Sequence, residues 1–175
     1  MNFENEKTKF LYRELANAAI NAALQHNKFY STQYINQNNI KEYWTDLLFE
    51  MIEKYKSPQI PEVFVNDIWD IKTKLINKYS DKITCRLSHT QKSLSVFLKY
   101  LWCMGKIEEP PVCPIDRKVL WEAGIKDEKT GRAKNWTELD DRKEYQDWLE
   151  KIEEAAKDKD KSMAQWELEI WNNQE

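Results

Sequence analysis

Apolar residues recur along this chain at intervals of three and four positions, which is the spacing of one face of an α-helix. In the first part of the chain this pattern predicts helices over about residues 7–26, 40–55, 61–79 and 88–104. The expected buried stripe of the first helix consists of Leu11, Leu15, Ala18, Ala19 and Ala22. The expected stripe of the fourth helix consists of Leu94, Phe97, Leu98, Leu101 and Trp102.

Polar residues and turn formers mark the ends of these helices. Asn38 or Asn39 can cap the second helix, because an asparagine side chain accepts hydrogen bonds from backbone N–H groups at a helix start. Ser88-x-x-Gln91 has the spacing of a capping box, so the fourth helix is predicted to start at Ser88. Gly105 suits the left-handed conformation that often closes a helix.

Shorter helices and polar loops follow. Pro114 is predicted to be the first residue of a short helix that ends at Gly124. Residues 126–135 have the composition of a polar loop. Asp141-x-x-Glu144 then predicts the start of a longer helix.

The last helix is rich in tryptophan. Ser162-x-x-Gln165 predicts its start. If its apolar face docks on the protein's own core, the tryptophans are structural. If that face is exposed, it can anchor a partner or a second copy of the chain, because tryptophan supplies a large contact area. The apolar positions of this helix are Met163, Trp166, Ile170 and Trp171.

Composition narrows the fold class. Three glycines and five prolines are few for a β-sandwich or barrel, whose many tight turns need such residues. No segment shows the alternation of a strand. We therefore predict an all-α protein, a compact bundle of about six to seven helices that ends in the Trp-rich helix. Residues 1–175 suit a single domain, in which residues 137–175 can form a C-terminal helical arm.

The chain is expected to work in the cytoplasm without a membrane. Its apolar runs are too short for a transmembrane helix, and its first residues lack the apolar core of a secretory signal. Three cysteines at irregular spacing fit reduced thiols better than a disulfide framework.

Charge is distributed unevenly. Residues 82–134 carry a net charge of +5, whereas residues 135–175 carry −7. The basic middle is compatible with a phosphate-bearing partner. It is equally compatible with packing against the acidic C-terminal helices.

Metal-binding residue types are present, but their spacing argues against a metal site. Cys85, His89, Cys103 and Cys113 are all zinc-ligand types. His89 and Cys103 are 14 residues apart in one predicted helix, which is roughly 21 Å and too far for one ion. Nothing marks a third group that would orient a Cys85–His89 pair for nucleophilic chemistry. We expect no metal and no cofactor.

One stretch resembles a known family. "LSHTQKSLSVFLKYL" followed by "PPVCPIDRKVLWEAGI", about residues 86–125, resembles the helix-hairpin-helix DNA glycosylase superfamily. The resemblance implies that Lys92 attacks the sugar and that Asp116 stabilises the developing sugar cation. The hairpin glycines of that family are absent, because residues 88–91 read SHTQ.

Two functions from different classes follow. The first is a non-catalytic binding or interaction module, whose partner could be DNA, another protein or, through the Trp-rich helix, a second copy. The alternative is a glycosylase-like protein that binds or acts on DNA, which requires Lys92 and Asp116 to face one solvent-filled groove. The residues expected to bind in that case are Arg86, Ser88, His89, Lys99, Arg117 and Lys118.

Overall fold

The computed structural model describes residues 5–25, 27–31 and 36–173 of this chain. Within these ranges it contains seven α-helices, two short 3-10 helices and no β-strand, which confirms the predicted all-α class. No described helix is both long enough and apolar enough to cross a bilayer. The α-helices are α1 (Glu6–Leu24), α2 (Gln37–Ile52), α3 (Pro61–Tyr79), α4 (Leu87–Cys103), α5 (Arg117–Glu122), α6 (Arg142–Lys157) and α7 (Met163–Asn172); the 3-10 helices are η1 (Lys54–Lys56) and η2 (Trp136–Glu138).

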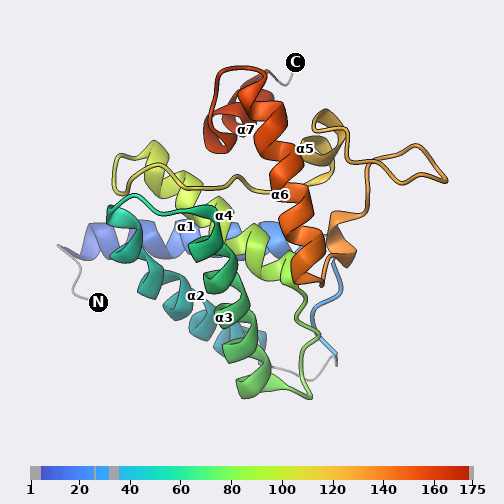
Figure 1. Ribbon diagram of the computed structural model, residues 1–175. Coiled ribbons are helices and arrows are strands. Elements are labelled where there is room, and N and C mark those ends of the chain that lie inside the picture. The colour runs from blue at the N-terminus through green and yellow to red at the C-terminus, as the bar shows by residue number, and fades with distance from the viewer. Residues whose placement is uncertain (1–4, 26, 32–35, 174–175) are drawn as a thin grey trace.

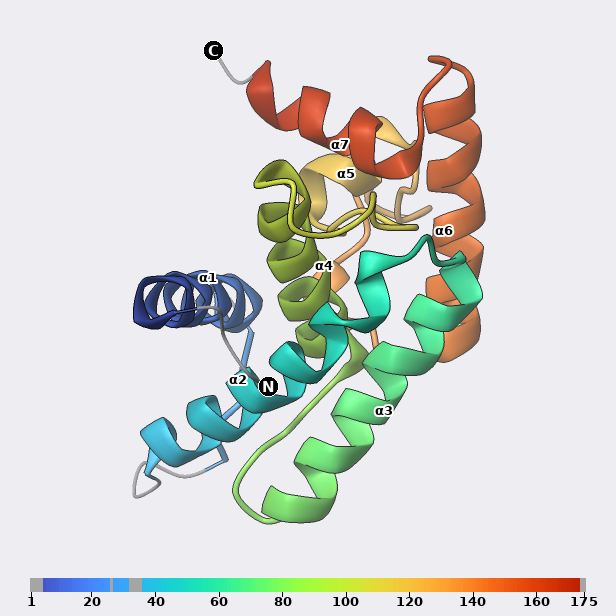
Figure 2. The same cartoon turned by 90° about the vertical axis from the view of Figure 1, so that its left-hand side faces the viewer.

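Helix α4 lies at the centre of the molecule. Figures 1 and 2 show α1 on one side of it, α2 and α3 below it, and α5 and α7 around its upper end. Every side chain from residue 87 to residue 98 is buried. Four members of the predicted stripe are fully buried and Trp102 is partly buried, which confirms that this helix packs the core.

The start of α4 differs from the prediction. Arg86 is the N-cap residue, and its backbone N–H donates to Nδ1 of His89 at 2.9 Å. Ser88 lies inside the helix, where its hydroxyl donates to the carbonyl of Thr137 at 3.1 Å. The predicted Ser88–Gln91 capping box is therefore wrong, because the helix already begins at Leu87 and the Ser88 hydroxyl bonds to a distant segment instead of accepting an N–H of the first turn.

That distant segment also covers the N-terminus of α4. The backbone N–H of Leu87 donates to Oδ1 of Asp140 at 2.8 Å, and that of Ser88 donates to the carbonyl of Leu139 at 2.9 Å. Free N–H groups are what make a helix N-terminus attractive to anions. Here the protein itself supplies the acceptors and the negative charge.

Helix α1 turns a different face to the core than predicted. Of the expected stripe only Ala19 is fully buried, whereas Leu11 is 40% exposed. The helix is rich in alanine, so two neighbouring faces of it are almost equally apolar and the sequence pattern does not distinguish them. The small alanine side chains also allow α1 to pack closely against α4. The buried residues are Tyr12, Ala16, Ala19, Ile20 and Ala23. The expected end of this helix, His26, lies outside the described residues.

Two other helix starts also differ from the prediction. Helix α2 is capped by Asn36, whose side chain accepts the N–H of Asn39, so neither Asn38 nor Asn39 is the cap. Helix α5 does not start at Pro114. Its N-cap is Asp116, whose Oδ1 accepts two backbone N–H groups of the first turn.

The C-terminal helices agree with the prediction. Asp141 and Ser162 cap α6 and α7 by accepting the N–H groups of Glu144 and Gln165. Trp166 is buried in the same hydrophobic core as α4, so α7 docks on its own protein.

Candidate functional site

A pocket of about 420 Å³ lies between α1, α4 and α7. Its volume and its mixture of apolar walls with a few polar groups are typical of small-ligand sites. It contains three of the residues that the sequence singles out, Lys92, Lys99 and Asp116. The full lining is Ala22, Gln25, Lys92, Val96, Lys99, Tyr100, Asp116, Trp136, Leu168, Trp171 and Asn172.

Lys92 and Asp116 form an ion pair in this pocket. Lys92 Nζ lies 3.0 Å from Asp116 Oδ2, and the two side chains are 9% and 13% exposed. The side-chain amide of Gln91 brings the two together, because it pairs with both the N–H and the carbonyl of Ile115. Asp116 is thus held beside α4, while its other oxygen caps α5.

A second ion pair lies about two turns further along α4, at Lys99. Lys99 Nζ is 2.9 Å from Oε1 of Glu167, whose side chain is fully buried. Burial raises the pKa of Glu167, and the nearby Lys99 opposes that shift. Sequence analysis missed Glu167. The available signal was its position, since it lies on the same face of α7 as Met163 and Ile170.

Two tryptophans complete the arrangement. Lys92 Nζ lies 5.7 Å from the ring centre of Trp136, and Lys99 Nζ lies 5.2 Å from that of Trp171. Each ammonium is therefore near both a carboxylate and an aromatic ring. These are distances at which a cation is attracted by the ring electrons. The pocket combines balanced charges with flat apolar walls.

Arg86, Ser88 and His89 are not brought to this pocket. Ser88 and His89 are fully buried, and a side-chain nitrogen of Arg86 donates to the carbonyl of Thr137. They lie at the N-terminal end of α4 under residues 137–140. The structure gives none of the three a place among the pocket's lining residues.

Arg117 and Lys118 line a different pocket. It has a volume of about 480 Å³ and lies beside α5, with Trp121, Arg132 and Ala133 as its other lining residues. The remaining predicted binding residues thus separate, with Lys99 in the first pocket and Arg117 and Lys118 in the second, because Asp116 faces one pocket and the next two residues face the other.

His89 is a buried neutral imidazole. Nδ1 accepts the Arg86 N–H, Nε2 has no partner among the described residues, and the ring packs 5.0 Å from that of Phe29. Burial lowers the pKa of His89 from 6.5 to about 4. A charged His89 would therefore oppose folding.

Acidification should accordingly destabilise the protein between pH 6.5 and pH 4. In this window the unfolded chain binds a proton at His89 and the folded chain does not, so stability is lost as the pH falls, by about 3 kcal/mol for this group. The free energy of urea unfolding, measured at several pH values, should show this slope. In His89→Gln, which retains a hydrogen-bond acceptor, the slope should become shallower. Identical slopes in the two proteins would contradict a neutral His89.

The buried thiols do not provide a nucleophile. Burial raises the pKa of Cys85 to about 12 and also raises that of Cys113. Cys103 is exposed and lies at the far end of α4. Among the residues that the structure describes, no three His, Cys, Asp or Glu side chains group as metal ligands would.

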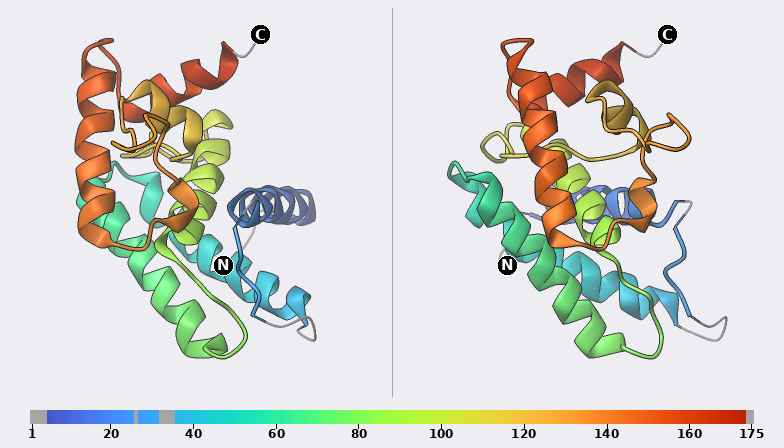
Figure 3. Two further views of the ribbon diagram at one scale, coloured as in Figure 1. Left: turned by 90° about the vertical axis from the view of Figure 1, so that its right-hand side faces the viewer. Right: turned by 45° about the vertical axis from the view of Figure 1, so that its right-hand side comes forward.

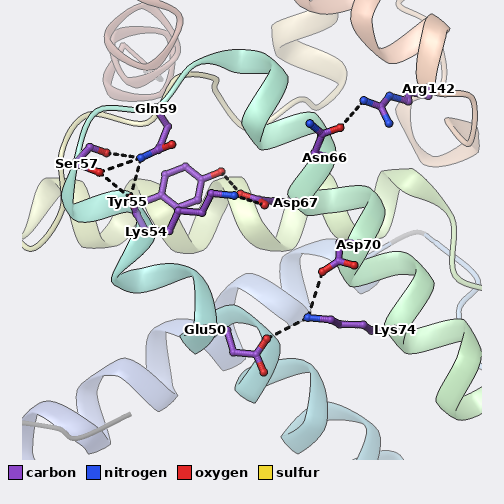
Figure 4. Close-up of polar contacts among 10 residues, drawn as sticks. All are labelled: Glu50, Lys54, Tyr55, Ser57, Gln59, Asn66, Asp67, Asp70, Lys74 and Arg142. Carbon is purple, nitrogen blue, oxygen red and sulfur yellow. Dashed lines mark hydrogen bonds and ion pairs between the residues drawn. The ribbon is translucent and has the colours of Figure 1, made fainter.

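A separate polar cluster fastens α2 and η1 to α3 (Figure 4). At its centre Asp67 accepts hydrogen bonds from Tyr55 OH at 2.9 Å and Lys54 Nζ at 2.6 Å. Burial and the charge of Asp67 raise the pKa of Tyr55, so this phenol stays protonated. Both oxygens of Asp67 are occupied by these partners, so we interpret the cluster as structural. Its outer contacts join Lys74 with Glu50 and Asp70, and Arg142 with Asn66.

Comparisons with known proteins add no family assignment. No protein-family model, no curated protein and no solved structure matches this chain. The resemblance of residues 86–125 to helix-hairpin-helix glycosylases therefore rests on those residues alone.

Proposed function

We propose that this protein is a non-catalytic binding module that takes a planar group of its ligand into the pocket between α4 and α7. The observation that carries the proposal is the composition of that pocket, in which two ion pairs face two tryptophan rings. Flat aromatic walls favour a flat ligand, because ring surfaces stack over a large apolar area.

The charges of the pocket indicate what kind of ring it would take. Lys92 and Lys99 are each neutralised by a carboxylate, so the site offers no net charge to an ion. It does offer both donors and acceptors at close range. A neutral heterocycle with hydrogen-bonding edges fits this combination better than a simple anion or a plain hydrocarbon.

The state of Lys92 favours binding over catalysis. A lysine attacks carbon only as the free amine, because the ammonium has no lone pair. In this structure the ammonium is held by Asp116, and both oxygens of Asp116 already accept hydrogen bonds. The Lys92–Asp116 ion pair therefore resembles a structural contact more than a nucleophile ready to react.

The proposal can be tested with a panel of neutral heterocycles: adenine, guanosine, uracil and indole. At least one should give saturable quenching of tryptophan fluorescence and saturation-transfer NMR signals. Trp171→Ala removes one wall and should weaken that binding about 5-fold or more, as expected for the loss of one stacking contact. Trp69→Ala is the matched control, because Trp69 is also about two-fifths exposed but lies on α3. Equal affinity in the two variants, or no saturable signal from the panel, would overturn the proposal.

One observation supports a second candidate. Lys92 and Asp116, the residues that the glycosylase resemblance assigns to catalysis, lie 3.0 Å apart in a single pocket. In this alternative the Lys92 ammonium first gives one proton to solvent water. As the glycosidic C–N bond breaks and its electron pair leaves with the base, which takes up a proton from water, the Lys92 nitrogen forms a new bond to the same sugar carbon. Asp116 stabilises the positive charge that develops on the sugar.

Borohydride trapping distinguishes this alternative from simple binding. Duplexes carrying uracil, 8-oxoguanine or an abasic site should give a covalent adduct that is lost in Lys92→Gln and retained in Lys143→Gln, because Lys143 is exposed on α6 and lines neither pocket. Asp116→Asn should slow turnover more than it weakens binding. If the protein neither retards DNA at low salt nor forms the adduct, the glycosylase alternative fails and the binding proposal stands.

A further inference from the structure

A second pocket, of about 480 Å³, lies between α5 and the loop that follows it. The loop folds back on itself, with a β-bridge between Lys126 and Ala133, and Figure 3 shows it projecting beside α5. The pocket and its rim contain four cations and an indole. We call this set the α5 surface: Arg117, Lys118, Trp121, Lys126 and Arg132.

Among the residues that the structure describes, the cations of the α5 surface have no carboxylate partner. Lysines on other helices form ion pairs with nearby acids, as Lys72, Lys143 and Lys157 do. Within the described part of the chain, none of the four cations of the α5 surface lies within ion-pair distance of a carboxylate; Lys118 instead donates to the carbonyl of Ile170 at 2.7 Å. Unneutralised charges of one sign, gathered in a hollow, attract counter-ions from solution.

Trp121 gives the α5 surface an exposed aromatic ring, which a site for a simple anion would not require. Its side chain is 49% exposed, and Lys126 Nζ lies 4.2 Å from its ring centre. An exposed lysine leaves such a ring at little cost, since an exposed cation–ring contact is weak. The indole face is then free to stack on a planar ring while the cations beside it contact phosphates.

We propose that the α5 surface binds single-stranded nucleic acid, with one base stacked on Trp121 and neighbouring phosphates on Arg117 and Arg132. A positively charged groove with an aromatic platform is the general arrangement by which proteins hold single strands. In a duplex the base faces are covered by their neighbours, so the indole would have nothing to stack on. A phosphopeptide would use the arginines but leave the indole without a role.

This inference goes beyond the proposed function and does not depend on it. The two pockets have no described lining residue in common, and the chain passes from one to the other between Asp116 and Arg117. A defect in the Lys92 pocket, such as Trp171→Ala, should leave strand binding at the α5 surface unchanged.

The test uses a fluorescein-labelled twelve-residue oligothymidylate and measures anisotropy over a range of salt concentrations. Binding should be saturable at low salt. Arg117→Gln combined with Arg132→Gln should reduce the log–log salt slope by about 1.4, because each phosphate contact on a single strand contributes about 0.7. Trp121→Ala should weaken binding about 5- to 150-fold at constant salt and leave the slope unchanged. Trp121→Phe, which keeps a smaller ring, should fall between wild type and Trp121→Ala.

Matched variants separate the site from general effects. Trp69→Ala removes a tryptophan that is 39% exposed and has Lys72 Nζ 4.8 Å from its ring centre, so it should bind as wild type does. Lys28→Gln with Lys151→Gln removes the same charge from exposed positions elsewhere and should leave most of the slope. The proposal is overturned if wild type does not bind, if Trp121→Ala and Trp69→Ala behave alike, or if polyphosphate or a twelve-pair duplex competes as well as the strand.

Discussion

Replacing Phe97 by alanine should lower the free energy of unfolding by about 3–5 kcal/mol. The ring of Phe97 is fully buried in the middle of α4, and its centre lies 6.1 Å from that of Phe49 on α2. Its removal leaves a cavity at the point where α4 meets its neighbours, and well-packed surroundings collapse only partly into such a space.

Urea unfolding measures this effect, provided that the slope against denaturant is the same in both proteins. Phe10→Ala is the control, because Phe10 lies on α1 and is 66% exposed. It should change stability little. A Phe97→Ala protein as stable as wild type would mean that α4 is not the centre of the core.

Replacing Lys99 by methionine should cost a similar amount, about 3–5 kcal/mol, for an electrostatic reason. Glu167 is fully buried and Lys99 is its partner at 2.9 Å. Without Lys99 the carboxylate keeps its desolvation penalty and loses the attraction that offsets it.

The double variant tests this explanation. Lys99→Met with Glu167→Leu removes both charges. Its free energy of unfolding should be close to that of wild type or higher, because a buried ion pair seldom stabilises a protein more than apolar side chains of similar size do. Lys143→Met is a control for lysine removal, since Lys143 is exposed and its pair with Asp147 lies in solvent. It should have little effect. A double variant as unstable as the single one would rule out an uncompensated charge as the cause.

The pH dependence of Lys99→Met provides a second check. Burial raises the pKa of Glu167, so the folded state binds its proton more tightly than the unfolded state does. The variant should therefore regain stability as the pH falls towards the ordinary pKa of glutamate, where the gain is complete, and lose stability as the pH rises through the raised pKa of the folded state. This is opposite in sign to the effect of His89, and the two can be separated in the Glu167→Leu background.

The candidate site was only partly predictable. The family resemblance points to Lys92 and Asp116, but these residues lie 24 positions apart and no local sequence pattern links them. No sequence signal identifies Glu167 or Trp136 as site residues, because a single charged or aromatic side chain does not reveal which distant residue it will contact. The separation of Arg117 and Lys118 from Lys92 could not be foreseen either, since it depends on which sides of α5 face α4 and the loop.

The sequence by itself determined which segments are helical and where several of them start. Apolar stripes and helix caps such as Asp141 and Ser162 depend on residues that are three or four positions apart in the sequence. Both can therefore be recognised without knowledge of the rest of the fold. The tertiary structure decided the buried face of α1, where alanines make two faces nearly equal, and the start of α4, where Asp140 lies 53 residues from its donor. It also decided which charges share a pocket. Those outcomes depend on contacts across long stretches of chain, whose energies arise only when the helices pack and exclude water.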